Sequence, residues 1–530
     1  MSTVNPFFGC DVRWLLDTRA DERGDHEFLV WRPHDGPRRA WSYDEFRRDV
    51  DRLGAALQRR GIDRGVQREP REQKLRTIVH VNAHEVTIGA VIVTTNTRSS
   101  VDELTYFLQS AHVEVTITQI QHAGTVGEAI RHTGRGRMHV AGGAAPSDQG
   151  APESEPFDAL LAESGDARRA AIDPEAAAGV QFTSGTTSRP KGVVWTHANY
   201  LWAGKVGADH ELLRPDDRYF TYLPLCHTNA QSYSVMASLW VGATIVLTPG
   251  FSASRFWDVA LTERTTWRAM VPFSVKALRR HATPADHSFR CWGNGIIVSS
   301  WEKKFGIPTL AWWGMTETVS HPIVSDPGIT AQPMSMGRAA TEYAVQLVDE
   351  AGTPIHGPGV GLLEVHGVAS VSLMLGYLHD PDATAAAFTT DGWLRTGDRV
   401  ELHDDGWFGF LERDKDMLKI GGENVAALEI ERVISGVRGV HEVAIVAGSD
   451  PMLDELPVAF VIASPNSEEL VNEIISACQS ALADFKVPRL VVIVDERPRS
   501  TLNKMAKNLL RADADLRLRA LSGAEHGGRT

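Results

Sequence analysis

Ten residues from Thr183 to Gly192 combine hydroxyl side chains, glycines and one lysine, Lys191, in the order Thr-Ser-Gly-Thr-Thr-Ser-Arg-Pro-Lys-Gly. The backbone N–H groups, hydroxyls and cation of such a loop can surround phosphate oxygens. A Walker loop is excluded, because its lysine precedes Ser or Thr at a helix start, whereas Lys191 lies between proline and glycine. The stretch therefore indicates a phosphate site, with an ordinary flexible loop as the alternative.

Two further motifs place aromatic, hydroxyl and carboxylate groups at turns. In Trp312–Glu317 an aromatic ring could stack on a flat base, Thr316 could bind a phosphate and Glu317 could hold Mg²⁺. In Gly392–Asp398 the carboxylate that follows a Thr-Gly turn could accept both hydroxyls of a ribose. Each motif has a structural alternative, namely a core aromatic beside a surface turn and an ordinary turn aspartate.

Two motifs nearer the C-terminus are rich in charge. The stretch Glu412–Val425 contains alternating charges followed by two glycines, and it could form a hinge and a mobile loop, or a solvated linker. The stretch Arg499–Lys507 carries lysines that could offset charge developing in a transition state, or that lie on the surface without such a role.

The segments that must position these motifs alternate between apolar runs and helical patterns, which indicates α/β layers. The expected strands of this part include Tyr219–Leu223, Ala243–Leu247, Trp267–Val271 and Gly295–Val298. From Tyr343 onward, short strands separated by turns predict a small antiparallel, β-barrel-like subdomain. A compact α+β pattern follows, so we expect a domain boundary near residues 412–416.

The composition excludes several classes of function. The 530-residue chain has a net charge of −13, which argues against nucleic acid as the main partner. No apolar run is long enough to span a bilayer, and the first residues lack the pattern of a secretory signal. The four cysteines form no CxxC pair, so they favour a reducing cytoplasm over a disulfide framework or a zinc site. These cysteines are Cys10, Cys226, Cys291 and Cys478.

The five motifs, in this order, resemble those of the adenylate-forming superfamily, which includes acyl- and aryl-CoA synthetases, adenylation domains of peptide synthetases and luciferases. The resemblance extends over nearly the whole chain. Within the superfamily, Phe182–Val194, Ser254–Trp257 and Gly421–Val425 are most similar to the carnitine/crotonobetaine-CoA ligase group.

This resemblance implies an ATP-dependent acid–CoA ligase that runs two half-reactions. A substrate carboxylate attacks MgATP to give acyl-AMP and pyrophosphate, and the thiol of coenzyme A then displaces AMP. ATP, Mg²⁺ and coenzyme A are therefore expected. The implied architecture is an N-terminal AMP-binding domain (1–412), a hinge (413–416) and a mobile C-terminal α+β domain (417–530), which rotates between the half-reactions.

The resemblance assigns the nucleotide site residue by residue. The β- and γ-phosphates would be held by Thr183, Ser184, Gly185, Thr186, Thr187 and Lys191. Trp313, followed by Gly314, would stack on adenine where the family usually has tyrosine. Thr316 would contact the α-phosphate as a catalytic residue, and Glu317 would hold Mg²⁺.

The C-terminal motifs receive roles in the same way. Asp398 would bind the ribose hydroxyls with Arg413 nearby, and Lys415 would be the hinge residue. Lys504 would be the catalytic lysine that contacts the carboxylate and the α-phosphate, although Asn503 precedes it where the family usually has glycine. The channel for the pantetheine arm of coenzyme A would be lined by Gly421, Gly422 and Glu423.

The acyl pocket is assigned on the segment Leu223–Thr228, which resembles the family sequence Pro-x-Phe-His, and on a glycine-rich segment further on. The implied pocket residues are His227, Asn229, Gly293, Asn294 and Gly295. For His227 a hydrogen-bonded core histidine is an equal alternative. The glycines, with Gly204 and Gly207 among them, could leave room for a bulky acyl group.

One segment departs from the family. Between Gly61 and Gly89 the length is family-like, but Val66–Val86 carries Arg, Glu, Gln, Lys and His in place of an apolar strand and an amphipathic helix. No strand is easily read at its start. Our hypothesis is that two compensating frame shifts, or a sequencing error, explain this better than gradual divergence, and an unambiguous in-frame reading of the gene segment would contradict it.

Other functions stay open at this point. Within the superfamily, the alternatives are a stand-alone adenylating enzyme that loads a separate carrier protein and a luciferase-like oxygenase. From a different class, a catalytically impaired homologue could act as a binding protein. A homodimer is a further open expectation.

Overall fold

The computed structural model describes the chain except for residues 1–3, 63–66, 72–87, 98, 100, 135, 142–153, 164, 184–189, 327–331, 414–416, 421–422, 451–452, 483, 496–506 and 527–530. The chain divides into two compact units. The first contains Met1–Thr183, Pro190–Val345 and Val365–Leu394, and the second contains Gln346–Glu364 and Arg395–Thr530. Each unit is described by itself below.

The first sheet of unit 1 runs in the order β16-β15-β14-β13-β12-β10-β11-β1-β2. Its strands are β1 (Glu27–Trp31), β2 (Arg39–Ser42), β10 (Arg218–Thr221), β11 (Thr244–Leu247), β12 (Trp267–Ala269), β13 (Cys291–Asn294), β14 (Thr309–Trp313), β15 (Ile323–Val324) and β16 (Ser335–Ala339). The strands from β14 to β1 pair in parallel, so their carboxyl ends meet at one edge. Open α/β sheets bind ligands at that edge.

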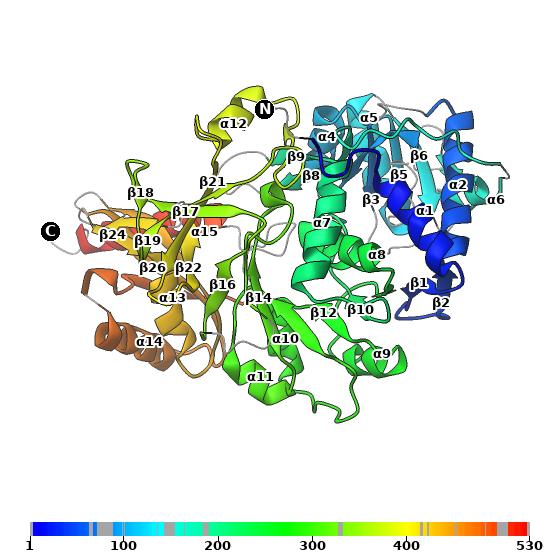
Figure 1. The fold of residues 1–530 in the computed structure, drawn as a ribbon. Coiled ribbons are helices and arrows are strands. Elements are labelled where there is room, and N and C mark those ends of the chain that lie inside the picture. The colour runs from blue at the N-terminus through cyan, green and yellow to red at the C-terminus, as the bar shows by residue number, and fades with distance from the viewer. Residues whose placement is uncertain are drawn as a thin grey trace. The chain divides into compact units, whose positions relative to one another are not determined.

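Helices cover both faces of this sheet (Figure 1). On one face, rings of α9 and α11 pack around Trp292 of β13. On the other face, Tyr233 from the π-helix η3 packs against Trp312 of β14. The helical elements around this sheet are α1 (Val12–Arg23), α7 (His197–His210), η3 (Asn229–Met236), α8 (Ala237–Val241), α9 (Phe256–Thr262), α10 (Pro272–Leu278), α11 (Ser299–Phe305) and η4 (Thr316–Thr318).

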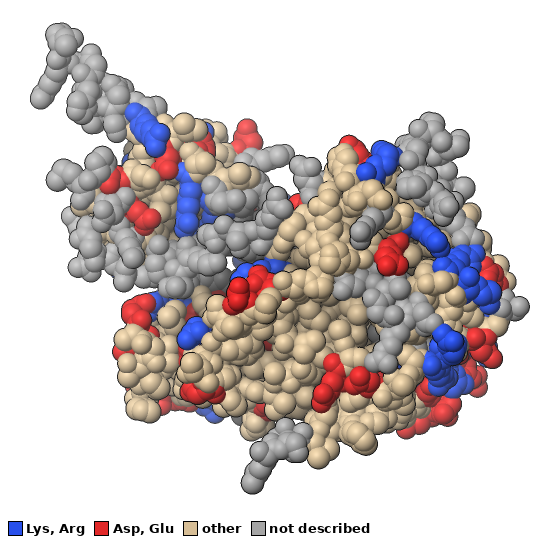
Figure 2. Space-filling model, turned by 90° about the horizontal axis from the view of Figure 1, so that it is seen from above, with Lys and Arg blue, Asp and Glu red and all other residues tan. Residues whose placement is uncertain are grey.

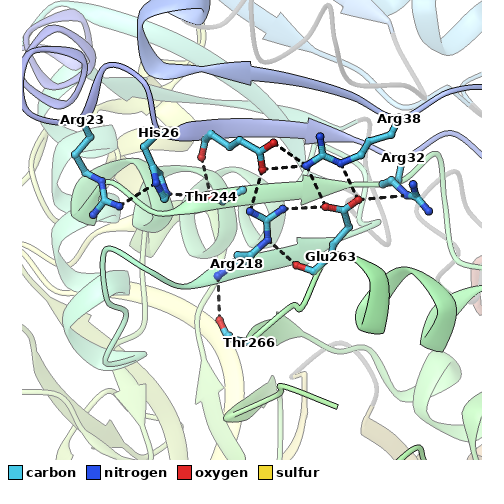
Figure 3. A network of polar contacts seen from close by, with 9 residues as sticks. Arg23, His26, Arg32, Arg38, Arg218, Thr244, Glu263 and Thr266 are labelled. Atoms are coloured by element: carbon cyan, nitrogen blue, oxygen red, sulfur yellow. Dashed lines mark hydrogen bonds and ion pairs between the residues drawn. The ribbon is translucent and has the colours of Figure 1, made fainter. Parts of the chain in front are cut away.

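A polar network joins the edge of this sheet to the end of α9 (Figure 3). The Glu263 carboxylate accepts hydrogen bonds from Arg38 at 3.0 Å and from Arg218 at 2.9 Å. Glu27 accepts from the same two arginines at 2.7 and 3.0 Å. Burial opposes the ionisation of Glu27, but these hydrogen bonds outweigh it and lower its pKa. The network therefore holds β1, β10 and α9 together through charges.

The second sheet of unit 1 runs in the order β20-β9-β8-β4-β3-β5-β6-β7. Its strands are β3 (Gln67–Arg71), β4 (Val91–Thr94), β5 (Val115–Gln119), β6 (Arg137–Ala141), β7 (Ser154–Pro156), β8 (Ala177–Thr183), β9 (Lys191–Thr196) and β20 (Gly376–Tyr377). Apolar side chains of α4 and α5 pack on one face, and those of α2 and α6 pack on the other (Figure 1). The helices of this layer are α2 (Tyr43–Arg59), α4 (Val101–Ser110), η1 (Ile120–His122), α5 (Ala123–Thr133), α6 (Phe157–Ala162) and α12 (Pro381–Ala387).

Two expectations about strands were wrong. Gln67–Arg71 forms β3 between β4 and β5, although no strand was read there. Backbone hydrogen bonds to both neighbouring strands form β3, although its sequence has no apolar pattern. The rest of Val66–Val86 lies outside the described residues. Conversely, Gly295–Val298 is not a strand. The strand of this region is β13 (Cys291–Asn294), which ends directly before Gly295 and pairs with β12 and β14.

Unit 2 contains a ladder in the order β18-β17-β19-β21-β22 and a second sheet in the order β24-β23-β26-β25, with β27 beside β26. The division between the units falls inside β17, β19 and β21. In the second sheet, α13 and α14 contribute to the apolar core on one face and α15 to that on the other. The elements are β17 (Ala344–Val348), β18 (Pro354–Ile355), β19 (Gly359–His366), β21 (Leu394–Leu402), β22 (Phe408–Arg413), β23 (Met417–Ile420), β24 (Glu423–Ala426), α13 (Ala427–Ser435), β25 (Val440–Asp450), β26 (Asp454–Ala463), α14 (Glu468–Ala481), η6 (Asp484–Lys486), β27 (Leu490–Ile493) and α15 (Lys507–His526).

The α/β layers, the short strands after Tyr343 and the α+β pattern near the C-terminus confirm the expected fold class. β10, β11 and β12 lie within one residue of the expected starts of their strands. In the described part of the chain, none of the helices combines the length and the apolar character that crossing a bilayer requires.

Candidate active site

Strands β8 and β9 form an antiparallel hairpin that brings together the two ends of the hydroxyl-rich stretch. The last Cα partners of the hairpin are Thr183 and Lys191, and the Thr183 hydroxyl donates to the Lys191 carbonyl at 3.3 Å. The Lys191 side chain is exposed at the mouth of the hairpin. The intervening site residues Ser184, Gly185, Thr186 and Thr187 lie outside the described residues.

Tyr377 connects this lysine to the carboxylate of the second motif. The Lys191 ammonium lies 4.8 Å from the centroid of the Tyr377 ring, within cation–π range. The Tyr377 hydroxyl donates to Oε1 of Glu317 at 2.9 Å. Burial, followed by the Glu317 charge, raises the pKa of Tyr377, so the phenol keeps its proton and remains a donor. A cation, a neutral phenol and a buried carboxylate therefore lie in a row.

Backbone contacts fix the segment that carries Tyr377. β20 pairs with β9 so that Tyr377 lies opposite Val193. The Met374 N–H donates to the Glu317 carbonyl at 2.9 Å. The Asn199 amide donates to two carbonyls of the same segment at 2.8 and 2.9 Å. The row of groups is thus set by the backbone as well as by the side chains.

Thr316 is held by buried neighbours. Its carbonyl accepts the indole N–H of Trp195 at 2.9 Å, and its hydroxyl lies 3.1 Å from the hydroxyl of Thr228. Thr228 in turn lies 3.1 Å from Oε1 of Gln181. At the end of the turn, Val319 adopts φ 64° and ψ −47°, which is costly for a β-branched residue. The surrounding contacts therefore hold this turn in a strained form, as is common at functional sites.

β14 ends in two tryptophans whose side chains point to opposite faces of the sheet, because strand residues alternate. Trp313 is mostly buried. At Gly314 a Cβ would lie 2.6 Å from the Tyr233 hydroxyl and still closer to the Ser320 carbonyl. Glycine is thus required for the close approach between the end of β14 and η3.

The residues expected in the acyl pocket lie at the carboxyl end of β13 and at the start of η3. Asn229 begins η3, one residue after Thr228, which touches Thr316. Oδ1 of Asn229 and Oδ1 of Asn294 are buried without a hydrogen-bond partner among the described residues. Buried unpaired polar atoms at such an edge are typical of a ligand site. The remaining members are His227, whose N–H donates to the Pro224 carbonyl at 3.1 Å, Gly293 and the exposed Gly295.

Gly293 does not leave the open space that was expected of it. A Cβ at this position would overlap the ring of Trp312. Gly295, in contrast, has no atom within 4 Å of such a Cβ. The structure therefore corrects the expectation that Gly293 gives room to a bulky group, because a neighbouring side chain occupies that room.

In unit 2, the antiparallel pair β21–β22 brings together two expected ribose-site residues. Asp398 and Arg413 are direct Cα partners. Asp398 is buried, and its N–H donates to the Thr396 hydroxyl at 3.1 Å. Glu423 begins β24. The expected residues Lys415, Gly421, Gly422 and Lys504 lie outside the described residues.

Comparisons with known proteins decide the family. The family described as AMP-binding enzyme matches residues 16–378, and the AMP-binding enzyme C-terminal domain matches residues 429–504. The chain belongs to the AMP-binding enzymes. It is 30% identical over 515 residues to a protein named crotonobetaine/carnitine–CoA ligase from Salmonella paratyphi C (strain RKS4594), covering 95% of this chain and 99% of that protein. Proteins of the same name from Salmonella typhi and Salmonella enteritidis PT4 (strain P125109) match with the same identity and coverage.

Solved structures support the fold of this AMP-binding enzyme. A crystal structure of an anthranilate CoA ligase in complex with anthranoyl-AMP has a TM-score of 0.85 at 24% identity, covering 96% of this chain and 98% of that one. An O-succinylbenzoate coenzyme A synthetase from Bacillus subtilis, in complex with AMP, has a TM-score of 0.82 at 23% identity, covering 94% and 98%.

The donor set of this AMP-binding enzyme suits Mg²⁺ delivered with a nucleotide. The described part of the chain contains no group of three or more His, Cys, Asp or Glu side chains arranged for a metal ion. Mg²⁺ that arrives with phosphates needs only one or two carboxylates from the protein, since phosphate oxygens and water complete its octahedron. The Glu317 carboxylate, buried and oriented through Oε1, fits that requirement.

The charged side chains of the described residues are mixed in sign on the face seen in Figure 2. Figure 2 shows Lys and Arg side chains interspersed with Asp and Glu over the described residues of that face. An extended basic field, which nucleic-acid binding requires, is not visible there. The interspersed charges agree with the net charge of −13.

Sequence reasoning missed the residues that orient the predicted ones in this AMP-binding enzyme. Tyr377, Thr228, Gln181 and Trp195 all contact a predicted site residue or a neighbour of one. Their local sequence carries no signal for these contacts, because every partner lies on a distant segment. In the sequence, Gly376 and Tyr377 indicate no more than a short extended stretch before a helix that begins at Pro381 with Asp380 as its N-cap.

Proposed function

We propose that this chain is an ATP-dependent, AMP-forming acid–CoA ligase. The observation that carries the proposal is the row formed by Lys191, Tyr377 and Glu317, because it provides a cation for phosphates and a carboxylate for Mg²⁺ at one place. Relatives that align almost end to end with the chain are named CoA ligases, which favours coenzyme A over a carrier protein as the acceptor.

The reaction has two balanced steps. An oxygen of the substrate carboxylate attacks the α-phosphorus of ATP, and pyrophosphate leaves to give acyl-AMP. The sulfur of coenzyme A, after losing its proton, attacks the acyl carbonyl carbon, and AMP leaves with the former carboxylate oxygen. The first step turns a poor electrophile into a mixed anhydride with a good leaving group.

We assign the phosphate half of the site as follows. Lys191 and the hydroxyl-rich loop hold the β- and γ-phosphates, Thr316 positions the α-phosphate, and Glu317 holds Mg²⁺. The bound ion supplies charge neutralisation on the phosphate oxygens. Trp313 offers a ring face for adenine. The hydroxyl contact from Thr228 and the phenol of Tyr377 keep Thr316 and Glu317 in position.

We assign the ribose, carboxylate and coenzyme A contacts of the site from the resemblance to the adenylate-forming superfamily. Asp398, paired across two strands with Arg413, binds the ribose. Lys504 contacts the carboxylate and the α-phosphate in the first step. The stretch Gly421–Glu423 lines the path of coenzyme A in the second step.

We propose residues 413–416 as the hinge between an N-terminal part (1–412) and a C-terminal part (417–530). Lys415→Pro restricts φ at the hinge, so it should slow the second half-reaction more than the first. Single-turnover measurement of each half-reaction tests this proposal. Equal rates in the variant and the wild type for both steps would contradict the placement of the hinge.

The function is tested by measuring pyrophosphate release from MgATP on a panel of carboxylic acids, with and without coenzyme A. An acid–CoA ligase releases pyrophosphate only when an acid is present, and it turns over to AMP and thioester only when the thiol is present. Acid-dependent turnover with a phosphopantetheinylated carrier but not with coenzyme A would favour the carrier-loading alternative. Folded protein without any acid-dependent release would refute the function.

The cysteines are the basis for proposing the cellular compartment of the enzyme. All four are free thiols, and three of them are buried. Free thiols of this kind persist in a reducing compartment, so we propose the cytoplasm.

A further inference from the structure

The face of Gly293 is covered by a large ring. β13 and β14 pair in parallel with Gly293 opposite Leu310. Trp312 lies two residues beyond Leu310, so its side chain points to the same face as residue 293. Its six-membered ring occupies the position that a Cβ of residue 293 would take. The carboxyl end of β13 is therefore closed on this face by indole.

The Trp312 ring is locked in this position. It stacks on His321 with ring centroids 4.7 Å apart and an interplanar angle of 18°. Tyr233 of η3 meets it edge-on at 5.4 Å and also contacts His321 at 3.9 Å. His321 is fully buried, and burial lowers its pKa, so it packs as a neutral aromatic ring. Moving the indole would disrupt a closely packed trio of rings.

The glycines of α7 do not provide an alternative cavity. At Gly204 a Cβ would lie 2.8 Å from the carbonyl oxygen of Met236. At Gly207 it would lie 3.3 Å from Cβ of Ala237. These glycines let α7 approach η3 and α8 closely, so the space beside each of them is taken by a neighbouring helix.

We propose that Trp312 is the end wall of the acyl pocket and that the substrate is a compact acid, with few carbon atoms beyond the carboxylate, rather than a long-chain fatty acid. The inference rests on the proposed function and on its pocket at Asn229, Gly293 and Asn294. The indole lies directly over Gly293 and against Tyr233, one turn after Asn229 on η3. A chain that extended past this point would meet the locked ring.

The test compares acids of increasing length, from butyrate to dodecanoate, by kcat/KM for pyrophosphate release with MgATP and coenzyme A. We expect the wild-type enzyme to prefer butyrate. Trp312→Leu should raise the ratio of dodecanoate to butyrate activity by about tenfold or more, since each methylene that fits a pocket is worth roughly that much. Trp312→Phe, which preserves an aromatic ring for the trio, should shift the ratio in the same direction by less.

Trp292→Leu is the matched control, because it removes a buried indole from the neighbouring strand on the opposite face of the sheet. It should lower the melting temperature without changing the preference among acids. An unchanged ratio in folded Trp312→Leu, or a wild-type enzyme that uses dodecanoate as well as butyrate, would overturn the inference while leaving the ligase function intact. Folded wild-type protein inactive on every acid would overturn both.

Discussion

Replacing Tyr377 with phenylalanine tests whether one phenol orients the metal carboxylate. The variant keeps the ring under the Lys191 ammonium but removes the 2.9 Å hydrogen bond to Oε1 of Glu317. A hydrogen bond to a charged acceptor contributes about 1.5–3 kcal/mol. If that energy fixes the carboxylate for Mg²⁺, the Mg²⁺ concentration for half-maximal rate should rise by about 10- to 150-fold. The KM for ATP at saturating Mg²⁺ should change little.

The assay is acid-dependent pyrophosphate release at fixed saturating ATP and increasing free Mg²⁺. Tyr377→Leu removes the ring as well, and it should add an increase of about two- to fivefold in the KM for ATP, since an exposed cation–π contact contributes about 0.5–1 kcal/mol. Tyr43→Phe is the control, because its buried phenol donates to the Ala243 carbonyl at 2.8 Å, away from these groups.

Three results would refute the reasoning about Tyr377. The first is a Mg²⁺ requirement that stays unchanged in Tyr377→Phe. The second is a requirement that falls, because the phenol would then compete with the ion for the carboxylate of Glu317. The third is an equal shift in Tyr43→Phe, because that would mean that any lost phenol in the core has the same effect.

Three other changes have defined outcomes. Thr228→Val keeps the shape but removes the hydroxyl beside Thr316, so adenylate formation should slow by about 5- to 150-fold, for a cost of about 1–3 kcal/mol, with little change in thioester formation from preformed acyl-AMP. Lys504→Ala should abolish adenylate formation yet preserve that second half-reaction, and equal loss of both would count against its role. The hydrogen bond from His210 lowers the pKa of Glu342 from 4.5 to about 2, so this stabilisation is present above pH 4.5 and is lost as the pH falls toward 2. Glu342→Gln should therefore flatten the acid side of the curve of unfolding free energy against pH by about 1 kcal/mol or less, and an unchanged curve would show that the pair has no such effect.

The parts of the site that follow from local sequence could be predicted. The apolar run before the hydroxyl-rich stretch indicates a strand, and β8 forms there. The sequence indicated a helix after the stretch, whereas the strand β9 comes first and pairs with β8, so the proximity of Thr183 and Lys191 is a finding of the structure. The position of Trp313 at the carboxyl end of β14 also follows from local sequence, because Gly314 comes directly after the apolar run that forms the strand.

Long-range packing could not be predicted. The short strand at Tyr377 gains its position from pairing with β9, and nothing in a two-residue strand specifies that partner. Gly293 was interpreted as empty space because the sequence does not reveal which neighbour fills it, whereas the parallel register with β14 places Trp312 there. β3 shows the converse case, since two neighbouring strands impose an extended backbone on Gln67–Arg71 despite its polar side chains.

The position of Tyr377 beside both Lys191 and Glu317 explains why these two charged side chains do not pair directly with each other. These two residues, both described, form no ion pair with each other, because the phenol ring and hydroxyl lie between them. A direct ion pair would neutralise the cation that phosphates need and the carboxylate that Mg²⁺ needs, and a nucleotide would have to break it first. Tyr377 is neutral, and it interacts with the Lys191 ammonium through its ring face and with the Glu317 carboxylate through its hydroxyl. Both charged groups therefore have a favourable contact without an ion pair between them. The hydroxyl-rich stretch that indicates phosphate binding in the sequence therefore relies on Tyr377, from a distant segment, to keep the Lys191 ammonium out of a direct ion pair with Glu317.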